Sequence, residues 1–427
     1  AQDGLYRLYS DGRRRRLTPE IDGSFQYLPR GSFTARAGVA RPEYSDSGLF
    51  AVSGEAGTRL ILADLRDGHE GDVVEIESPG DGAAPLASSI DARAALFLAR
   101  DGSASRLLLA RAGKPPRELA RINAHLNGVE LGEWRIVSYR LGHPDGAPPP
   151  REVESCVLLP PGYEPGKRYP LIIEVYPGAR ATCEPGPASA PPLPDATSPY
   201  LFAARGYIYS GITLPRDLIA TQDGPISGMD EAVEQSVDAL VRAGYADPSR
   251  TVLFGTSQGG ASALYVAAQS HSFRAVISGH GWADNFSHYF SGHGVYGALY
   301  GEETPFGNMT RYESEAGADF GVGRTLFEDP DLYVRTSPVF LARGVSCPVM
   351  LIHSDMDGFP IEQYDEMFAA LYRLGKEARY VRYWGEGHAI SSPANMRDLW
   401  ERLDLFLAEA LASSSDSMKA YRQDQVP

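Results

Sequence analysis

The stretch 251-TVLFGTSQGGASAL-264 constrains the fold of this chain more than any other part of the sequence. An apolar strand candidate runs into 255-GTSQG-259, and residues at helical spacing follow. The pattern Gly-x-Ser-x-Gly between a strand and a helix is typical of a nucleophile elbow, a sharp turn that exposes the serine hydroxyl. Glycines flank the serine because a Cβ would clash in so sharp a turn. The pattern predicts Ser257 as a nucleophile at the carboxyl end of a strand.

Strand and helix candidates alternate after the Pro-rich passage 144-PDGAPPP-150. This alternation is typical of an α/β domain with a parallel, doubly wound sheet. The expected strands are 153–159, 170–176, 207–212, 251–254, 274–278, 348–353 and 379–384, and the expected helices are 228–244, 258–270, 361–375 and 394–411.

The first 130 residues have a different pattern, with short apolar runs split by Asp-Gly turns. Similar hairpins are expected at 5–18, 60–76 and 107–120, and their starts are 55 and 47 residues apart. This spacing is close to the roughly 40–50 residues of one β-propeller blade. A closed propeller needs about 4–8 blades. We therefore expect residues 1–130 to form a partial, all-β propeller region of about three blades, with the other blades on a missing or separate segment.

Partners for the serine follow it in the chain. One later strand candidate leads into a loop with Asp355 and Asp357, and the last one leads into a loop with His388. An α/β-hydrolase arranges its triad in the order Ser, Asp or Glu, His. Open α/β sheets gather their sites at the carboxyl ends of the strands. Ser257, one of the two aspartates and His388 are therefore candidates for a catalytic triad.

These motifs resemble the prolyl oligopeptidase family of serine peptidases, over residues 134 to 412. The matching segments are 157-VLLPPGYEPGKRYPLIIEVYPG-178, 255-GTSQGG-260, 350-MLIHSDMDGFPIEQ-363 and 383-YWGEGH-388. The resemblance implies a catalytic α/β-hydrolase domain, assigned to residues 131–427, behind a β-propeller. Full-length members carry a complete propeller, so the chain resembles a member without its N-terminal blades.

The resemblance also assigns roles within the site. The family motif His-Gly-x-x-Asp matches 353-HSDMD-357, which favours Asp357 over Asp355 as the triad acid. The family often stabilises the oxyanion with a Tyr hydroxyl and the N–H after the nucleophile, which here match Tyr176 and Gln258.

An aromatic segment, 279-GHGWADNFSHYF-290, corresponds to the family's specificity pocket. Trp282, Phe286 and Tyr289 would line a small apolar pocket, and ordinary core packing is the alternative. Phe359 is the fourth candidate for the pocket. It stands where members commonly carry an Arg or Asn that holds the substrate backbone, so this chain is expected to anchor its substrate differently from those members.

Two further departures are Ser354 and Ala389, at positions where the family commonly has Gly. The long segment 291–330, rich in Gly and aromatic residues, is expected to form a lid or entrance loop.

No metal or cofactor is expected. The histidines of this region, His280, His288 and His293, match no zinc spacing, and triad chemistry needs no cofactor. His353 is expected to be a buried strand-end residue.

Composition excludes several other classes of function. The chain has 55 acidic and 40 basic residues and a net charge of −15 at pH 7, whereas nucleic acid and anionic lipid bind to clustered positive charge. The run Arg13 to Arg16 is interpreted as a solvated hairpin turn. No apolar run is long enough to span a bilayer, and the 3 cysteines fit no disulfide framework. The compartment, cytoplasmic or periplasmic, stays open, as does a homodimer.

The function predicted is hydrolysis of peptide bonds in short or unusually shaped peptides through an acyl-enzyme on Ser257. Three alternatives remain: a lasso-peptide isopeptidase of the same family, a carboxylesterase on the same fold, and a propeller scaffold without enzymatic activity.

Overall fold

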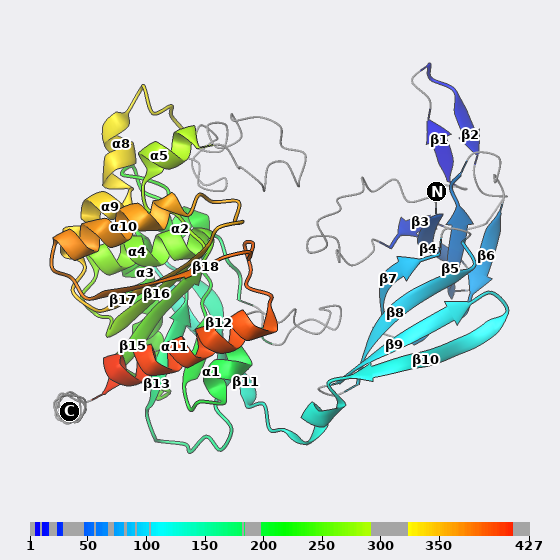
Figure 1. Cartoon of the computed structure of the whole chain (residues 1–427), viewed down its shortest axis with the longest axis horizontal. Coiled ribbons are helices and arrows are strands. Elements are labelled where there is room, and N and C mark those ends of the chain that lie inside the picture. Colours follow the sequence, from blue (N-terminus) through cyan, green and yellow to red (C-terminus); the bar gives the residue numbers. More distant parts are fainter. Residues whose placement is uncertain are drawn as a thin grey trace. The chain divides into compact units, whose positions relative to one another are not determined.

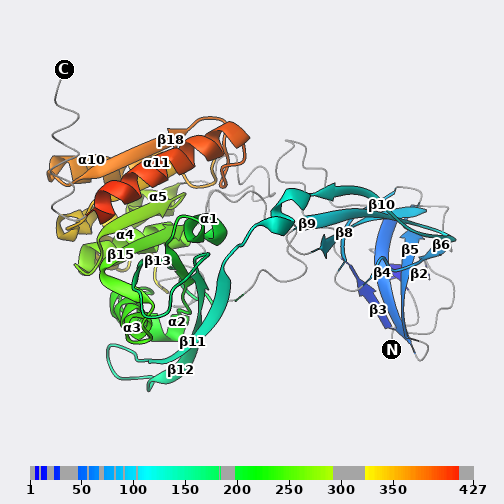
Figure 2. The same ribbon diagram turned by 90° about the horizontal axis from the view of Figure 1, so that it is seen from below.

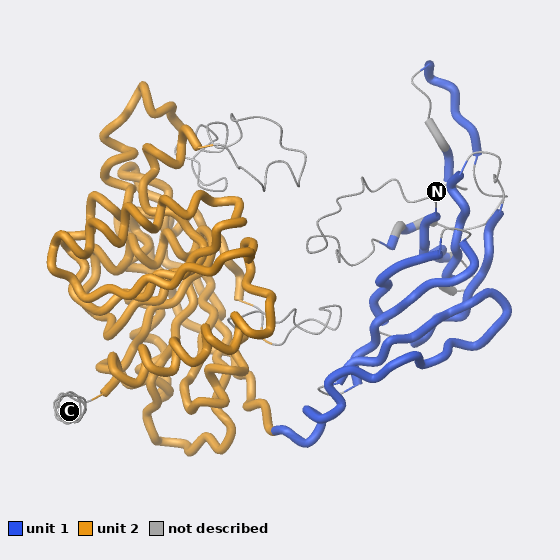
Figure 3. Tube along the Cα trace, in the orientation of Figure 1, with its two compact units in different colours: residues 1–129, 185–193 blue, residues 130–184, 194–427 orange. Residues whose placement is uncertain are grey.

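The computed structural model divides the chain into two compact units, coloured separately in Figure 3. Unit 1 comprises residues 1–129 and 185–193, and unit 2 comprises residues 130–184 and 194–427. The structure describes residues 5–8, 11–16, 24–28, 47–54, 57–66, 72–80, 83–89, 92–101, 104–181, 183, 198–291 and 323–412.

Apart from one short 3-10 helix, the regular elements of unit 1 are all strands in its described residues. Two antiparallel four-stranded sheets have the orders β3-β4-β5-β6 and β10-β9-β8-β7, and β1 pairs with β2 in a separate hairpin. The strands are β1 (Tyr6–Leu8), β2 (Arg14–Arg16), β3 (Ser24–Tyr27), β4 (Ser47–Gly54), β5 (Gly57–Asp64), β6 (Val73–Ile76), β7 (Ala84–Ser88), β8 (Ala94–Asp101), β9 (Ala104–Arg111) and β10 (Lys114–Ile122). Four-stranded antiparallel meanders of this kind are the blades of β-propellers.

The three predicted hairpins are confirmed. They correspond to the antiparallel pairs β1–β2, β5–β6 and β9–β10. Leu62, Ala95 and Phe97 belong to a hydrophobic cluster that draws on β4, β5, β6, β8 and β9, so apolar packing joins the two four-stranded sheets. A short 3-10 helix, η2 (Ala124–Gly128), ends the unit.

Unit 2 is built on one sheet with the order β11-β12-β14-β13-β15-β16-β17-β18 among the described residues (Figure 1). Its strands are β11 (Glu133–Leu141), β12 (Arg151–Leu159), β13 (Tyr169–Glu174), β14 (Ile208–Gly211), β15 (Ala246–Thr256), β16 (Ala275–Gly279), β17 (Val349–Ser354) and β18 (Ala378–Tyr383). The run from β14 to β18 is parallel, whereas β11–β12 and β12–β14 are antiparallel. The prediction of a parallel sheet was therefore wrong at this edge, where the short connection between β11 and β12 can join only antiparallel neighbours.

Helices cover both faces of the sheet, as Figures 1 and 2 show. Helices α3 (Met229–Arg242), α4 (Gln258–Gln269) and α10 (Glu362–Arg373) contribute to one buried apolar cluster, and α1 (Pro199–Ala203) and α11 (Pro393–Leu411) contribute to the other. Strands β16 and β17 are buried along their whole length, as expected for parallel strands that have helices on both sides. This is the doubly wound arrangement of an α/β-hydrolase.

The remaining elements of unit 2 are short. They are α2 (Arg216–Ile219), α5 (Asn285–Phe290), α8 (Pro330–Arg335), α9 (Pro338–Leu341) and the 3-10 helix η3 (Ala342–Gly344). A disulfide joins Cys156, on β12, to Cys183. No helix of the described residues combines the length and the apolar character that crossing a bilayer requires.

Candidate active site

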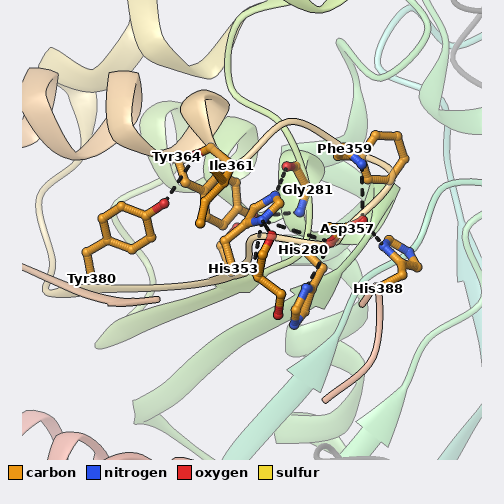
Figure 4. A network of polar contacts seen from close by, with 11 residues as sticks. His280, Gly281, His353, Asp357, Phe359, Ile361, Tyr364, Tyr380 and His388 are labelled. Atoms are coloured by element: carbon orange, nitrogen blue, oxygen red, sulfur yellow. Dashed lines mark hydrogen bonds and ion pairs between the residues drawn. The ribbon is translucent and has the colours of Figure 1, made fainter. Parts of the chain in front are cut away.

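Four polar side chains follow the carboxyl ends of four adjacent parallel strands. Ser257 follows β15, His280 follows β16, Asp357 lies three residues beyond β17, and His388 lies in the loop after β18. Because β15 to β18 run parallel, these strand ends lie at one edge of the sheet. Asp357 and His388, which sequence analysis had singled out, are in direct contact there (Figure 4).

The turn at Ser257 has the strained geometry of a nucleophile elbow. Ser257 has φ 59° and ψ −129°, a region that costs a residue with a side chain about 1–3 kcal/mol. Its amide donates to Gly279 O at 2.9 Å, and its carbonyl accepts from Gly260 N at 2.9 Å. These bonds hold the serine between β16 and the first turn of α4.

The predicted need for glycine on both sides of the serine is confirmed. A Cβ on Gly255 would lie 2.1 Å from Gly259 O, and a Cβ on Gly259 would lie 2.3 Å from Val175 O. Real Cβ atoms do not approach backbone oxygens so closely, so any larger residue would displace the elbow.

Tyr176 lies beside this turn. It follows β13, its side chain is 39% exposed, and its Cδ2 would be 3.2 Å from a Cβ on Gly259. Gln258 is buried at the first position of α4, where its Oε1 accepts from Nη2 of Arg216 at 3.3 Å. The N-terminus of α4 therefore faces the same turn as Tyr176, and helix N-termini favour negative charge.

Three donors surround the Asp357 carboxylate, whose side chain is fully buried. Oδ1 lies 2.8 Å from Nδ1 of His388 and 3.1 Å from the amide nitrogen of Phe359, and Oδ2 lies 2.9 Å from Nδ1 of His280. Burial raises the pKa of Asp357, but the hydrogen bonds from His280 and His388 outweigh it, so the pKa lies well below the usual range. An ionised carboxylate only accepts hydrogen bonds, so both imidazoles donate their Nδ1–H to it.

Asp355 has a different place in the same loop. It is exposed, and its Oδ1 accepts from the amide of Gly385 at 2.6 Å. His388 therefore contacts Asp357, while Asp355 ties the loop after β17 to the loop after β18.

Glu386 organises the loop that carries His388, and sequence analysis missed it. Its carboxylate accepts from the amides of Ser391 and Ser392 at 2.9 and 3.0 Å and from Nδ2 of Asn395 at 2.8 Å. Burial raises the pKa of Glu386, but these hydrogen bonds prevail and bring it down to about 2. The buried carboxylate thus remains ionised at the N-terminus of α11 and fixes the loop two residues before His388.

The aromatic residues predicted for the pocket form one cluster. Trp282 and Tyr289 are buried, and Phe286 and Phe359 pack against them. The Trp282 ring lies 5.1 Å from the Phe359 ring, which lies 5.3 Å from the His388 imidazole, measured between centroids. Phe359 therefore connects the cluster to His388, while Tyr289, with 1% exposure, packs deeper.

His353 is buried at the end of β17, as predicted. It accepts from the Ser354 amide through Nδ1 at 2.9 Å, and its Nε2 lies 3.3 Å from Gly281 O. Burial lowers its pKa to about 4, so the imidazole is neutral at neutral pH.

A metal ion would find three ligand atoms, from His280, His353 and Asp357, within 4.8 Å of one another. Hydrogen bonds within the protein engage Nδ1 of His280, Nδ1 of His353 and both carboxylate oxygens of Asp357. The arrangement therefore needs no ion to balance it. The predicted lid, 291–330, lies for the most part outside the described residues, and so does His293.

Residues 231–414 match the family model described as "Prolyl oligopeptidase family". The match spans α3 to α11 and includes Ser257, Asp357 and His388. Over this region, which is less than half of the chain, the sequence is similar to the prolyl oligopeptidase family. The fold, an all-β region followed by an α/β-hydrolase sheet, is shared with solved structures of peptidases.

Two curated relatives cover similar parts of the chain. A protein named "Probable glutamyl endopeptidase, chloroplastic" from Oryza sativa subsp. japonica is 31% identical over 270 residues, which are 58% of this chain and 26% of that protein. A lasso peptide isopeptidase of Asticcacaulis excentricus is 25% identical over 271 residues, 59% of this chain and 34% of that protein. The chain thus spans about a quarter to a third of the length of these relatives.

A solved structure shares the fold over most of the chain. The puromycin-hydrolyzing peptidase of Mycobacterium tuberculosis superposes with a TM-score of 0.57 at 20% identity, covering 94% of this chain and 57% of that one.

Proposed function

We propose that the chain is a serine peptidase that forms an acyl-enzyme on Ser257. The observation that carries the proposal is the contact of His388 Nδ1 with Asp357 Oδ1 at 2.8 Å, at the sheet edge where Ser257 sits on its elbow. The Nδ1–H bond to Asp357 leaves Nε2 of His388 as the basic atom of the ring. His388 takes the proton from the Ser257 hydroxyl as the oxygen attacks the substrate carbonyl. It then donates that proton to the leaving amine, and water releases the acyl group by the same route.

Charge develops on the carbonyl oxygen during the attack. The Tyr176 hydroxyl and the Gln258 N–H are the two donors proposed for it, because both belong to segments that meet at the elbow. Two fixed donors of this kind lower the barrier by several kcal/mol.

The aromatic cluster supports an apolar group next to the scissile bond. Phe359 contacts His388, so it would lie against the substrate close to the reacting carbonyl. An Arg or Asn at that position would bind the substrate backbone, and the phenyl ring cannot.

An isopeptidase is the second candidate. It is supported by the likeness to the lasso peptide isopeptidase and by Phe359, which removes a polar anchor suited to an extended peptide. Cleavage of a threaded peptide, tested against the linear peptide of the same sequence, separates this candidate from a general peptidase.

The disulfide between Cys156 and Cys183 supports an oxidising compartment, such as the periplasm, as the place of action. Alkylation of the native protein with and without prior reduction tests this: two additional thiols after reduction are expected.

A fluorophosphonate probe tests the proposed activity. One adduct on the parent protein and none on Ser257→Ala, measured by intact mass, is the expected result. Ser262→Ala is the matched control, since Ser262 lies in α4, the helix that follows Ser257, and is buried with its Oγ donating to Gln258 O. A folded parent without an adduct would contradict the proposal and favour the scaffold alternative. Turnover of an amide beside the matching ester then separates a peptidase from a carboxylesterase, which would leave the amide intact.

A further inference from the structure

We propose that His280 is a positioning residue for the triad, a second imidazole that holds Asp357 from the side opposite His388. This inference rests on the proposed function, because it concerns how the catalytic aspartate is held. Figure 4 shows Asp357 between the two histidines. Nδ1 of His280 lies 2.9 Å from Oδ2, while His388 and the Phe359 amide share Oδ1.

The backbone at His280 is set for this contact. His280 has φ 52°, a conformation that residues with a side chain seldom adopt, and its amide donates to Ile352 O at 2.8 Å. The next amide, of Gly281, donates to the Tyr364 hydroxyl at 3.1 Å. The turn after β16 is thereby fixed to β17 and α10, and it directs a buried imidazole at the buried carboxylate.

No neighbouring titratable group named below replaces His280 as the second donor to Asp357. His353 from β17, Tyr364 from α10 and His388 from the loop after β18 surround it, together with Asp357. His353 is not the second donor, because its Nδ1 accepts from the Ser354 amide and lies 4.0 Å from Oδ2. Burial raises the pKa of Tyr364, so this hydroxyl is neutral.

Two effects follow from the bond to Oδ2. It fixes the rotation of the carboxylate, so that Oδ1 stays in line with His388. It also draws part of the negative charge toward His280, which weakens the stabilisation of the His388 imidazolium. Without His280, Oδ1 remains tied to the Phe359 amide, so His388 keeps its partner but becomes more basic.

Three substitutions of His280 separate the effect of its Nδ1–H donor from the effects of the imidazole ring and of the backbone conformation. Asn places its Nδ2 where His has Nδ1 and tolerates positive φ, so His280→Asn retains the donor. His280→Ala removes it. His280→Gly removes it as well and relieves the backbone, so agreement between Ala and Gly excludes strain as the cause. Ser278→Ala is the structural control, because Ser278 is buried on β16, the strand that His280 follows, and bonds Gly260 O and Tyr364 rather than Asp357.

The first readout is the second-order rate of fluorophosphonate labelling at pH 5 to 9. His280→Ala and His280→Gly are expected to label about 10- to 100-fold more slowly, as for loss of one hydrogen bond to a charge, with the acid limb of the profile moved to higher pH. His280→Asn and Ser278→Ala should keep the parent's acid limb. Equal profiles for all variants, or an equal loss in Ser278→Ala, would overturn the role of His280.

The second readout does not need activity. In protein labelled with ¹⁵N-histidine, the Nδ1–H of His388 is expected to shift in His280→Ala and to stay in place in His280→Asn, and the pKa of His388 should rise only in the former. An unchanged His388 signal in His280→Ala would overturn the inference. A parent protein that does not react with the fluorophosphonate would overturn the proposed function. The imidazole NMR signals would still decide whether His280 positions Asp357.

Discussion

Oδ1 of Asp357 accepts from Nδ1 of His388 at 2.8 Å and from the Phe359 amide at 3.1 Å. Substitution Asp357→Asn retains the shape but replaces one oxygen by an amide that donates. The remaining oxygen can still accept from the Phe359 N–H and from His388, and the new amide then faces Nδ1 of His280. Because the neutral amide no longer stabilises the His388 imidazolium, we expect the rate of fluorophosphonate labelling to fall by about 10³- to 10⁴-fold, the size of loss typical when Asn replaces the Asp of a Ser-His-Asp triad.

Asp355→Asn is the matched control for this substitution. Asp355 lies in the same loop but bonds the amide of Gly385 and not an imidazole. Its labelling rate is expected to stay within about tenfold of the parent, the effect of one exposed hydrogen bond. A similar loss in both variants would mean that loop structure, and not the contact with His388, is what Asp357 provides.

Tyr176→Phe tests the proposed oxyanion donor. The ring packs beside Gly259 and is 39% exposed, so loss of the hydroxyl should leave the unfolding midpoint unchanged. Removal of one oxyanion donor typically costs about 10²- to 10³-fold in kcat. We expect a loss of this size in kcat with little change in KM, measured with a chromogenic peptide amide. A change in KM alone would assign Tyr176 to substrate binding instead.

The sequence predicted the parts of the site that depend on local pattern. The elbow at Ser257 requires a strand, two glycines and a helix, all contiguous in the chain. The order of the partners favoured His388 and one of two aspartates, and the family motif then favoured Asp357. The strands from β12 to β18 and the four long helices were likewise predicted from apolar periodicity. Strand β11 was missed because charged residues such as Glu133 and Arg135 interrupt its apolar pattern.

The role of His280 was missed because it depends on a contact distant in the chain. His280 meets Asp357 across 77 positions, and only the placement of β16 between β15 and β17 brings them together. A signal was available: His280 directly follows a buried strand, at the edge where the sheet gathers its site. Glu386 lies within the family motif 383-YWGEGH-388, but its role depends on the serines and Asn395 at the start of α11.

Glu386→Gln should reduce stability in a pH-dependent way. The pKa of Glu386 is about 2 in the folded protein, against an ordinary value of 4.5. Its stabilisation is therefore fully present above pH 4.5 and is lost as the pH falls toward 2, about 3 kcal/mol in total. We expect Gln to lower the free energy of unfolding at pH 7 by about that amount. Between pH 5 and pH 2 the free energy of unfolding of the variant should change less with pH than that of the parent.

Chemical unfolding at several pH values measures this effect. The exposed Glu401, on the outer side of α11, gives the control Glu401→Gln, which should follow the pH dependence of the parent. Parallel curves for the parent and Glu386→Gln would show that the carboxylate is not held in its ionised form.

Gly259→Ala should disable the site through backbone displacement. The added Cβ would lie 2.3 Å from Val175 O, at the end of β13, which is held between β14 and β15. Since β13 cannot retreat, the first turn of α4 must move, and Ser257, Gln258 and the contact with Tyr176 move with it. We expect labelling of Ser257 to be lost and the protein to be destabilised by about 1–3 kcal/mol, as for overpacking.

Gly279→Ala is the matched control, because its Cβ would meet Thr256 Cγ2 at an ordinary 3.4 Å and its carbonyl would still accept from Ser257. Normal labelling of Gly259→Ala would contradict the assignment of the elbow as a closely packed, rigid turn.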